Sequence, residues 1–411
     1  MLEQDPVKKE VLYLGTEFGL WISVDDGKNW MKWSHGFPTV STIALIVHPR
    51  DHDLVIGTHG RSAYILDDIR PLRSVTKELL GAPLHMFPIS NTYQYQVKQM
   101  NGYHFPGDAW FAGENRPYGA LITYVVNPPK EQKDSTADQS ADESSGGERP
   151  EGKDKMKTKF QVLDQSGTVI RNFEGPMEKG INRVTWNLRR DAFRRPQLTQ
   201  QQGEGFGGGG PEVPPGKYTV RAKLGNQEVS QTVDVLPDPR VSVPPHARQQ
   251  NYELILNVGA KLEVVAEAVS RIQKTRAAID IVLGQIKDRN DEGAKNLRKQ
   301  STELKKALTR VADLFIDDPT AAQGIVRRPN TVTAKLGSVS RSLSTSWDSP
   351  NPTQLVSLRQ AEDVLAKALK EFNRLFSEDV AMYRTAVEQA KLPLVPESGQ
   401  LNLDWKPKKR E

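Results

Sequence analysis

The stretch "SVDDGKNW", Ser23 to Trp30, places an alcohol, an aspartate, a glycine and a tryptophan at fixed offsets. It lies between two runs, "GLWISV" and "NWMKW", that are rich in the β-branched and aromatic residues that strands prefer. Asp25 can accept hydrogen bonds from backbone N–H groups of a turn, Gly27 can adopt a positive φ, and Trp30 can pack under the loop. The stretch therefore predicts a hairpin turn that its own residues hold together.

A second stretch of the chain repeats this pattern. Aligning "VLYLGTEFGLWISVDD" (residues 11–26) with "DLVIGTHGRSAYILDD" (residues 53–68) places Gly15 over Gly57, 42 residues later. A repeat of about 40 to 45 residues made of strand-like segments is typical of a four-stranded β-propeller blade. Two copies are visible, so the sequence predicts one full blade and part of another.

The first copy matches the Asp-box, Ser-x-Asp-x-Gly-x-Asn-Trp, of sialidase-like and sortilin-like propellers. In those proteins the box looks like a structural element that stabilises the blade, and it is not part of the active site. The resemblance implies the same role for four residues of this chain, Ser23, Asp25, Gly27 and Trp30. The second copy departs from the pattern, because Ile65, Ile69 and Leu72 stand at the serine, glycine and tryptophan positions.

The resemblance covers most of the chain. Three further stretches, "GTHGRSAYILDDIRPLR", "NRPYGALITYVV" and "GINRVTWNLRRD", look like the end of a bacterial sortilin-like or BNR-repeat propeller protein, a class often labelled glycosyl-hydrolase-like. The resemblance implies that residues 1–95 are the C-terminal one to two blades of a partial β-propeller, with other blades upstream of Met1 or on another chain. We therefore expect the C-terminal portion of a longer protein. The family is secreted or periplasmic, but no signal peptide opens this sequence.

Residues 96–240 contain several short strand-like runs separated by turn signals. The segments at residues 164–167 and 224–227 each predict a hairpin between two such runs. The pattern indicates a small β-sandwich and resembles the Ig-like domain of flagellar-hook-capping type, with Trp186 as its expected core anchor.

Three segments are expected to lie outside packed structure. The insertion at residues 128–157 is polar and almost without large apolar residues, which predicts disorder. The Gly-rich loop at residues 203–210 lacks the Lys-Ser/Thr pair of a phosphate-binding loop, so we interpret it as a flexible insertion. Residues 393–411 form a basic tail that ends in "KPKKRE".

In residues 246–392 the apolar residues fall three and four apart, the spacing of amphipathic helices with a narrow seam. The residues of the four seams are Ile255, Val258, Leu262, Val265, Val269, Ile272, Ile279, Leu283 and Ile286; Leu297, Leu304, Leu308, Val311 and Phe315; Val332, Leu336, Val339 and Leu343; and Leu358, Leu365, Leu369, Phe372, Phe376 and Tyr383. Four apolar seams in one chain can bury one another, which predicts an antiparallel four-helix bundle. The alternative is an intermolecular coiled coil. Arg276 interrupts the first seam, and it would need a carboxylate partner only if it were buried.

The predicted fold class is thus a multidomain protein, first β and then α: a partial propeller, an Ig-like sandwich and a helical bundle. The 411 residues are 37% hydrophobic and 26% charged, which is typical of globular domains. The absence of cysteine excludes disulfides and thiolate chemistry. A net charge of +5 and the lack of an apolar run of about 18 residues lead us to expect neither a nucleic-acid partner nor a membrane span.

Candidate site residues lie in "HPRDHDLVIGTHGR". His48 and His52 straddle a proline-containing turn, and His-x-x-x-His is a metal pair chiefly on a helix, so we expect no metal site and no cofactor. His59 and Arg61 flank Gly60 in a loop between strands, where Arg61 could bind a carboxylate. These two are the candidate ligand contacts.

Two hypotheses on function follow from these patterns. The first is a non-catalytic binding or scaffold protein that takes a protein or glycan ligand on its propeller face and self-associates through exposed blade edges or the long helix. The second is a glycoside hydrolase of sialidase type whose catalytic blades lie upstream. Sialidase chemistry needs residues from several blades, so no catalytic residue is assigned in this chain.

Overall fold

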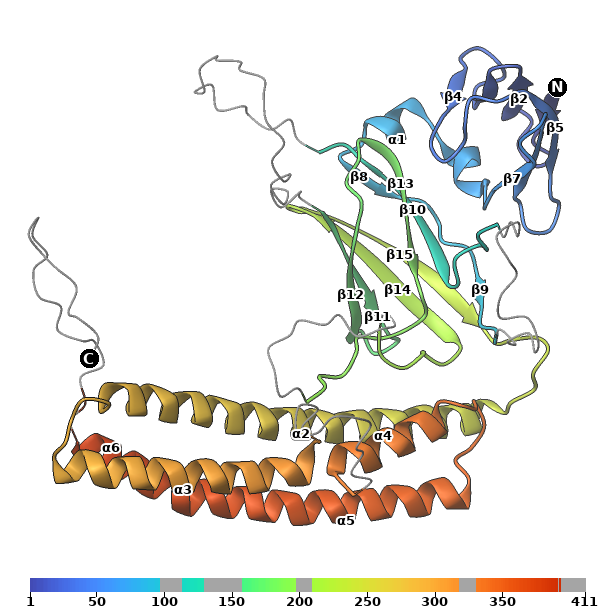
Figure 1. Ribbon diagram of the computed structural model, residues 1–411. Helices are drawn as coiled ribbons and strands as arrows, with labels where there is room; N and C mark the ends of the chain where they lie inside the picture. The colour runs from blue at the N-terminus through green and yellow to red at the C-terminus, as the bar shows by residue number, and fades with distance from the viewer. Residues whose placement is uncertain (97–112, 129–156, 197–208, 318–329, 391, 393–411) are drawn as a thin grey trace, which may run out of the picture. The chain divides into compact units, whose positions relative to one another are not determined.

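The structure is a computed structural model of the chain, and it describes residues 1–96, 113–128, 157–196, 209–317, 330–390 and 392 (Figure 1). The predictions of a disordered insertion, a Gly-rich loop and a basic tail fall almost wholly outside these residues. The chain is mixed β and α, with several sheets, one of them curled like half of a barrel, followed by helices. It divides into two compact units, Met1–Asp191 with Glu212–Ser242, and Ala192–Pro211 with Val243–Glu411.

The first unit begins with two antiparallel sheets. The four-stranded sheet has the order β1 (Leu2–Gln4), β2 (Leu12–Thr16), β3 (Gly19–Ser23) and β4 (Met31–Trp33). The three-stranded sheet has the order β5 (Thr42–Val47), β6 (Leu54–Thr58) and β7 (Ala63–Leu66). Each repeat found in the sequence is therefore a pair of antiparallel strands, β2 with β3 and β6 with β7.

These two sheets pack on each other through one face of each. The shared core includes Tyr13, Leu20 and Ile22 from the first sheet and Leu45, Leu54 and Ile56 from the second. Gly15 permits the contact, because a Cβ at this position would lie 2.7 Å from Thr42 Cγ2. A buried ion pair adds to it, since Arg73 Nε lies 3.0 Å from Asp5 Oδ1. Arg73 belongs to η1 (Arg70–Ser74), the 3-10 helix that follows the second sheet.

The remaining strands of the first unit form two more sheets around a second core (Figure 1). One has the order β13 (Gly180–Trp186), β10 (Ala120–Val126) and β8 (Leu84–Met86), and α1 (Lys77–Gly81) precedes it in the chain. The other has the order β12 (Val169–Gly175), β11 (Thr158–Leu163), β14 (Gly216–Leu224), β15 (Gln227–Leu236) and β9 (Thr92–Tyr93). The two predicted hairpins are confirmed, as β11 pairs with β12 and β14 with β15, and Trp186 is buried in this core.

The described part of the second unit holds five α-helices, and four were predicted. They are α2 (Pro245–Gln285), α3 (Glu292–Phe315), α4 (Val332–Leu343), α5 (Pro352–Leu375) and α6 (Ala381–Gln389). The difference arises in the last predicted segment, which a π-helical turn, η2 (Phe376–Val380), divides into α5 and α6. Every residue of the four predicted seams belongs to, or packs against, a single apolar core.

Polar contacts fix how α2 and α3 lie together. Asp280 of α2 pairs with Lys305 of α3, and Arg276 Nη2 donates to Thr309 Oγ1 at 2.7 Å. From the first of these contacts to the second, the residue number decreases in α2 and increases in α3. The two helices are therefore antiparallel (Figure 1). Arg276 is partly exposed and bonds to a hydroxyl, so this break in the seam does not bury an unpaired charge.

A short stretch before the helices is anchored on α2 by Phe193. A Cβ built on Gly259, in the middle of α2, would lie 2.0 Å from Phe193 Cε2, so the ring rests directly on the helix backbone. Glycine costs an α-helix stability relative to alanine, and the close approach of Phe193 explains its presence at a buried helical position.

We expect Gly259→Ala and Phe193→Ala to be strongly non-additive. In a Phe193→Ala background, Gly259→Ala should stabilise α2 by about 1 kcal/mol, because only helix propensity remains. In the wild type the clash with Phe193 should cancel or reverse that gain. Urea unfolding followed by circular dichroism at 222 nm would give the four free energies, and equal effects of Gly259→Ala in both backgrounds would contradict the contact.

Candidate functional site

Ser23 is the last residue of β3, and Asp25, Gly27 and Trp30 lie in the turn between β3 and β4. Ser23 Oγ donates to Asp25 Oδ1 at 2.9 Å and accepts from the Gly27 N–H at 2.9 Å. Asp25 also accepts from the Asn29 backbone N–H at 2.8 Å and from Asn29 Nδ2 at 2.6 Å. Gly27 has a φ of 79°, and the Trp30 ring lies beside it. The hydrogen bonds of Ser23 and Asp25 stay within the turn, an arrangement that closes a loop.

The Asn29 hydrogen bonds also set the acidity of this turn. The side-chain and backbone N–H groups of Asn29 lower the pKa of Asp25 to about 2. The charged carboxylate is therefore the form that holds the turn in the folded protein.

His59 and Arg61 lie together on the turn between β6 and β7. Both side chains are exposed, and the turn is tight, with positive φ at Gly60 and at Ser62. Neither residue lines the two cavities described below. The structure thus brings the pair together at an exposed tip and not in a pocket.

His48 and His52 have different surroundings. His48 Nδ1 accepts a hydrogen bond from the Asp51 N–H at 3.1 Å, which closes the turn between β5 and β6. His52 faces the Arg73 guanidinium, and burial together with that charge lowers the pKa of its imidazole. Among the described residues, no three His, Asp or Glu side chains gather in a way that could hold a metal ion.

A cavity of about 420 Å³ lies within the first unit and is the strongest candidate for a binding site. Four separate segments line it: Trp33 and His35 at β4, Leu66 to Leu72 after β7, Thr123 in β10, and Pro176 to Arg183 leading into β13. Cavities of this size, mostly apolar with a few polar groups, are typical ligand sites. Sequence reasoning missed it, because no one of these segments carries a motif.

Arg183 holds one wall of this cavity. Its Nη1 donates to the Asp67 carbonyl at 2.6 Å, its Nη2 to the Asp68 carbonyl at 2.8 Å, and its Nε to Thr123 Oγ1 at 3.1 Å. Asp68 has a φ of 45°, an uncommon conformation for a residue other than glycine. The guanidinium therefore fixes both the backbone at the end of β7 and its position against β10 and β13.

Asp68 is a buried carboxylate in the same wall. Burial would raise its pKa, but the hydrogen bond and charge of Arg70, whose Nε lies 2.6 Å away, hold the pKa below its ordinary value. Ser90 donates to the second oxygen at 3.1 Å. This carboxylate is thus ionised and fully engaged, so it is not suited to donate a proton as a general acid.

Several residues that line the cavity are exposed. His35, Glu178 and Lys179 are exposed, and Trp33 is half-buried, lines the cavity and also packs against the apolar core of the first two sheets. Asn182 is buried and bonds to the backbone of the turn at Glu178, which orients this part of the rim. An aromatic ring beside mixed donors and acceptors suits a ligand with both apolar and hydroxyl-bearing surfaces.

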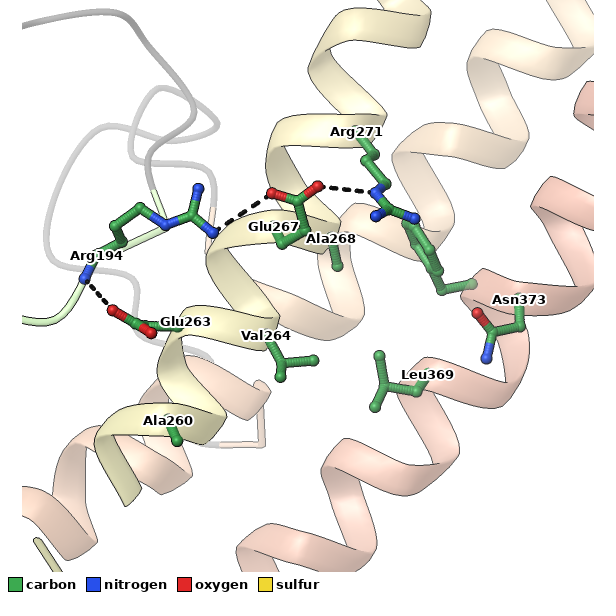
Figure 2. A pocket seen from close by; sticks show the side chains of 10 residues that line it. Arg194, Ala260, Glu263, Val264, Glu267, Ala268, Arg271, Leu369 and Asn373 are labelled. Atoms are coloured by element: carbon green, nitrogen blue, oxygen red, sulfur yellow. Dashed lines mark hydrogen bonds and ion pairs between the residues drawn. The ribbon is translucent and has the colours of Figure 1, made fainter. Parts of the chain in front are cut away.

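A second cavity, of about 400 Å³, lies in the helical unit (Figure 2). Figure 2 shows an apolar floor with Val264 and Leu369, and charged groups that bind one another along the rim. Glu267 bonds to Arg271 at 2.9 Å and to Arg194 at 3.4 Å. Because these charges are already paired, this groove is a weaker candidate than the cavity beside Trp33.

Comparison with known proteins does not assign this site. No protein-family model and no curated protein matches the chain. Within the residues that the structure describes, no helix has the length and apolar character needed to cross a membrane.

The contribution of Asp25 to folding stability should decrease in acid. Because the folded pKa of Asp25 is lowered to about 2, its contribution to stability is complete above the unfolded pKa of about 4 and disappears as the pH falls through about 2. We expect Asp25→Asn to lower the urea midpoint at pH 6, with the gap to wild type narrowing between about pH 4 and pH 2. The neighbouring exposed Asp26→Asn should have little effect, and a gap that stays constant with pH would contradict the assignment.

Removing the Arg183 guanidinium should destabilise the first unit by about 2 to 4 kcal/mol, since two backbone carbonyls would lose their donors. The test is the unfolding free energy of Arg183→Met in urea. Arg171→Met is the matched control, because Arg171 makes one long contact of 3.4 Å with a half-exposed Asp191. It should cost less than about 1 kcal/mol, and equal losses in the two variants would show that Arg183 has no special role.

Proposed function

We propose that this chain is a non-catalytic binding and scaffold protein related to the sortilin-like, BNR-repeat propellers, and that the cavity beside Trp33 binds part of a glycan. The observation that carries the proposal is the cavity itself, whose lining includes the indole of Trp33 and the exposed Glu178 and Lys179. A cavity of about 420 Å³ fits a small ligand or a chain end better than a flat protein surface.

The finer architecture belongs to the same proposal. The sheets β1 to β4 and β5 to β7 are interpreted as propeller blades, and the strands from β8 onward as an Ig-like sandwich. Helices α2 to α6 are interpreted as a helical bundle in which α5, η2 and α6 continue one another. The shared apolar core of these helices and their antiparallel α2–α3 contact support this interpretation.

Glycoside hydrolysis is less well supported. Such enzymes need a protonated carboxyl and a second carboxylate about 5 to 10 Å apart across the substrate. Of the two acidic residues at the cavity, Asp68 is held ionised by Arg70, and Glu178 lies on the exposed rim. Their surroundings favour ligand contact over proton transfer.

Glycan-array binding by the full chain tests the proposal. We expect Trp33→Ala to reduce binding at least 10-fold, because stacking on the indole would be lost. Phe18→Ala is the matched control, since Phe18 is an exposed aromatic residue at the β2–β3 turn, outside the cavity. Equal binding by the two variants, or hydrolysis of aryl glycosides by the wild type, would overturn the proposal.

A further inference from the structure

The sheet of β5, β6 and β7 is apolar on both of its faces. Its inner face is covered by the first sheet, as described above. On its outer face, strand register aligns Ile46, Val55 and Ile65 in one row across the three strands. The next row on the same face is Ala44, Gly57 and Ala63. We call these six residues the outer face.

The outer face is exposed within the part of the chain that the structure describes. Ile46 is 59% exposed and Ile65 62% exposed, and Val55 between them is half-buried. None of the six residues is charged, although exposed sheets commonly carry lysine or another charge that prevents unwanted pairing. Contiguous exposed apolar residues of this kind mark an interaction surface.

We propose that the outer face packs against the outer face of a second copy of this chain. The two rows differ in size: one has three large β-branched residues and the other has only alanine and glycine. They lie two residues apart along the strands, or about 7 Å. A two-fold axis parallel to the rows and midway between them would place the large row of each copy over the small row of the other.

This self-complementarity favours a second copy over a different partner. A two-fold interface brings the same surface together from both subunits, so a charged face would meet a like charge, and this uncharged face does not. Ala44 and Gly57 adjoin in the small row, since a Cβ at Gly57 would lie 3.1 Å from Ala44 Cβ. The inner face of the same sheet already shows that an apolar sheet is a suitable cover.

The small size of the outer face limits the affinity of the dimer. Six residues are fewer than the roughly 20 to 30 that each partner gives to a standard interface. We therefore expect a weak dimer that forms only at high concentration. This contact is independent of the cavity beside Trp33, and it differs from edge-to-edge pairing because it uses the sheet face.

Sedimentation velocity of the full chain from about 10 to about 500 µM tests the dimer. We expect the wild type to shift toward a dimer as concentration rises, and Ile65→Glu to weaken association at least 10-fold. Ile281→Glu is the matched control, because Ile281 is 64% exposed on α2, in the other unit. It should associate as the wild type does, provided that circular dichroism shows all three proteins folded.

A second measurement uses the absence of cysteine from the chain. A nitroxide on Ile65→Cys should give an intermolecular dipolar signal in pulsed electron paramagnetic resonance at high concentration, and one on Ile281→Cys should not. A wild type that stays monomeric throughout, or association that Ile281→Glu weakens equally, would overturn the proposal. Slow thiol labelling of Ile65→Cys in a monomer would also overturn it, because the chain itself would then cover the face.

Discussion

The guanidinium of Arg183 is the contact on which the architecture of the first unit depends. It gives all three of its nitrogen positions to protein acceptors, and two of these are the main-chain carbonyls of Asp67 and Asp68. These bonds are partly buried, and a partly buried carbonyl that loses its donor loses stabilisation. One side chain thus joins the end of the second sheet to β10 and β13, and the same side chain lines the candidate cavity.

The sequence predicted the structural features whose causes are local. The turn from Ser23 to Trp30 is closed by hydrogen bonds between residues two and four apart, so its spelling contains the whole cause. The hairpins at 164–167 and 224–227 are similar, since turn residues and flanking strands adjoin in the chain. The seam residues of the helices were also identified, because the three-and-four spacing directly reflects which side of a helix is buried.

Features that depend on distant residues could not be predicted in this way. Arg183 and the Asp67 carbonyl are 116 residues apart, and nothing in either stretch indicates the other. The cavity has the same origin, since its lining comes from four segments. The π-helical turn at Phe376–Val380 is another case, because the wider turn changes the backbone hydrogen bonding without breaking the apolar pattern. Conversely, His59 and Arg61 looked promising as a short motif, yet they lie on an exposed tip.

The strand β5 shows that an apolar sequence does not by itself reveal what covers each face of a strand. Its sequence "TIALIV" is a continuous apolar run, which indicates that both faces of the strand are suited to burial but does not say what covers either. The structure covers Leu45 and Val47 with the first sheet and leaves Ile46 exposed. Ile46 is therefore an exposed apolar residue in a strand whose sequence is suited to burial on both faces. Trp33 is likewise a large aromatic residue that is only half-buried, because it packs against the apolar core and also lines the cavity.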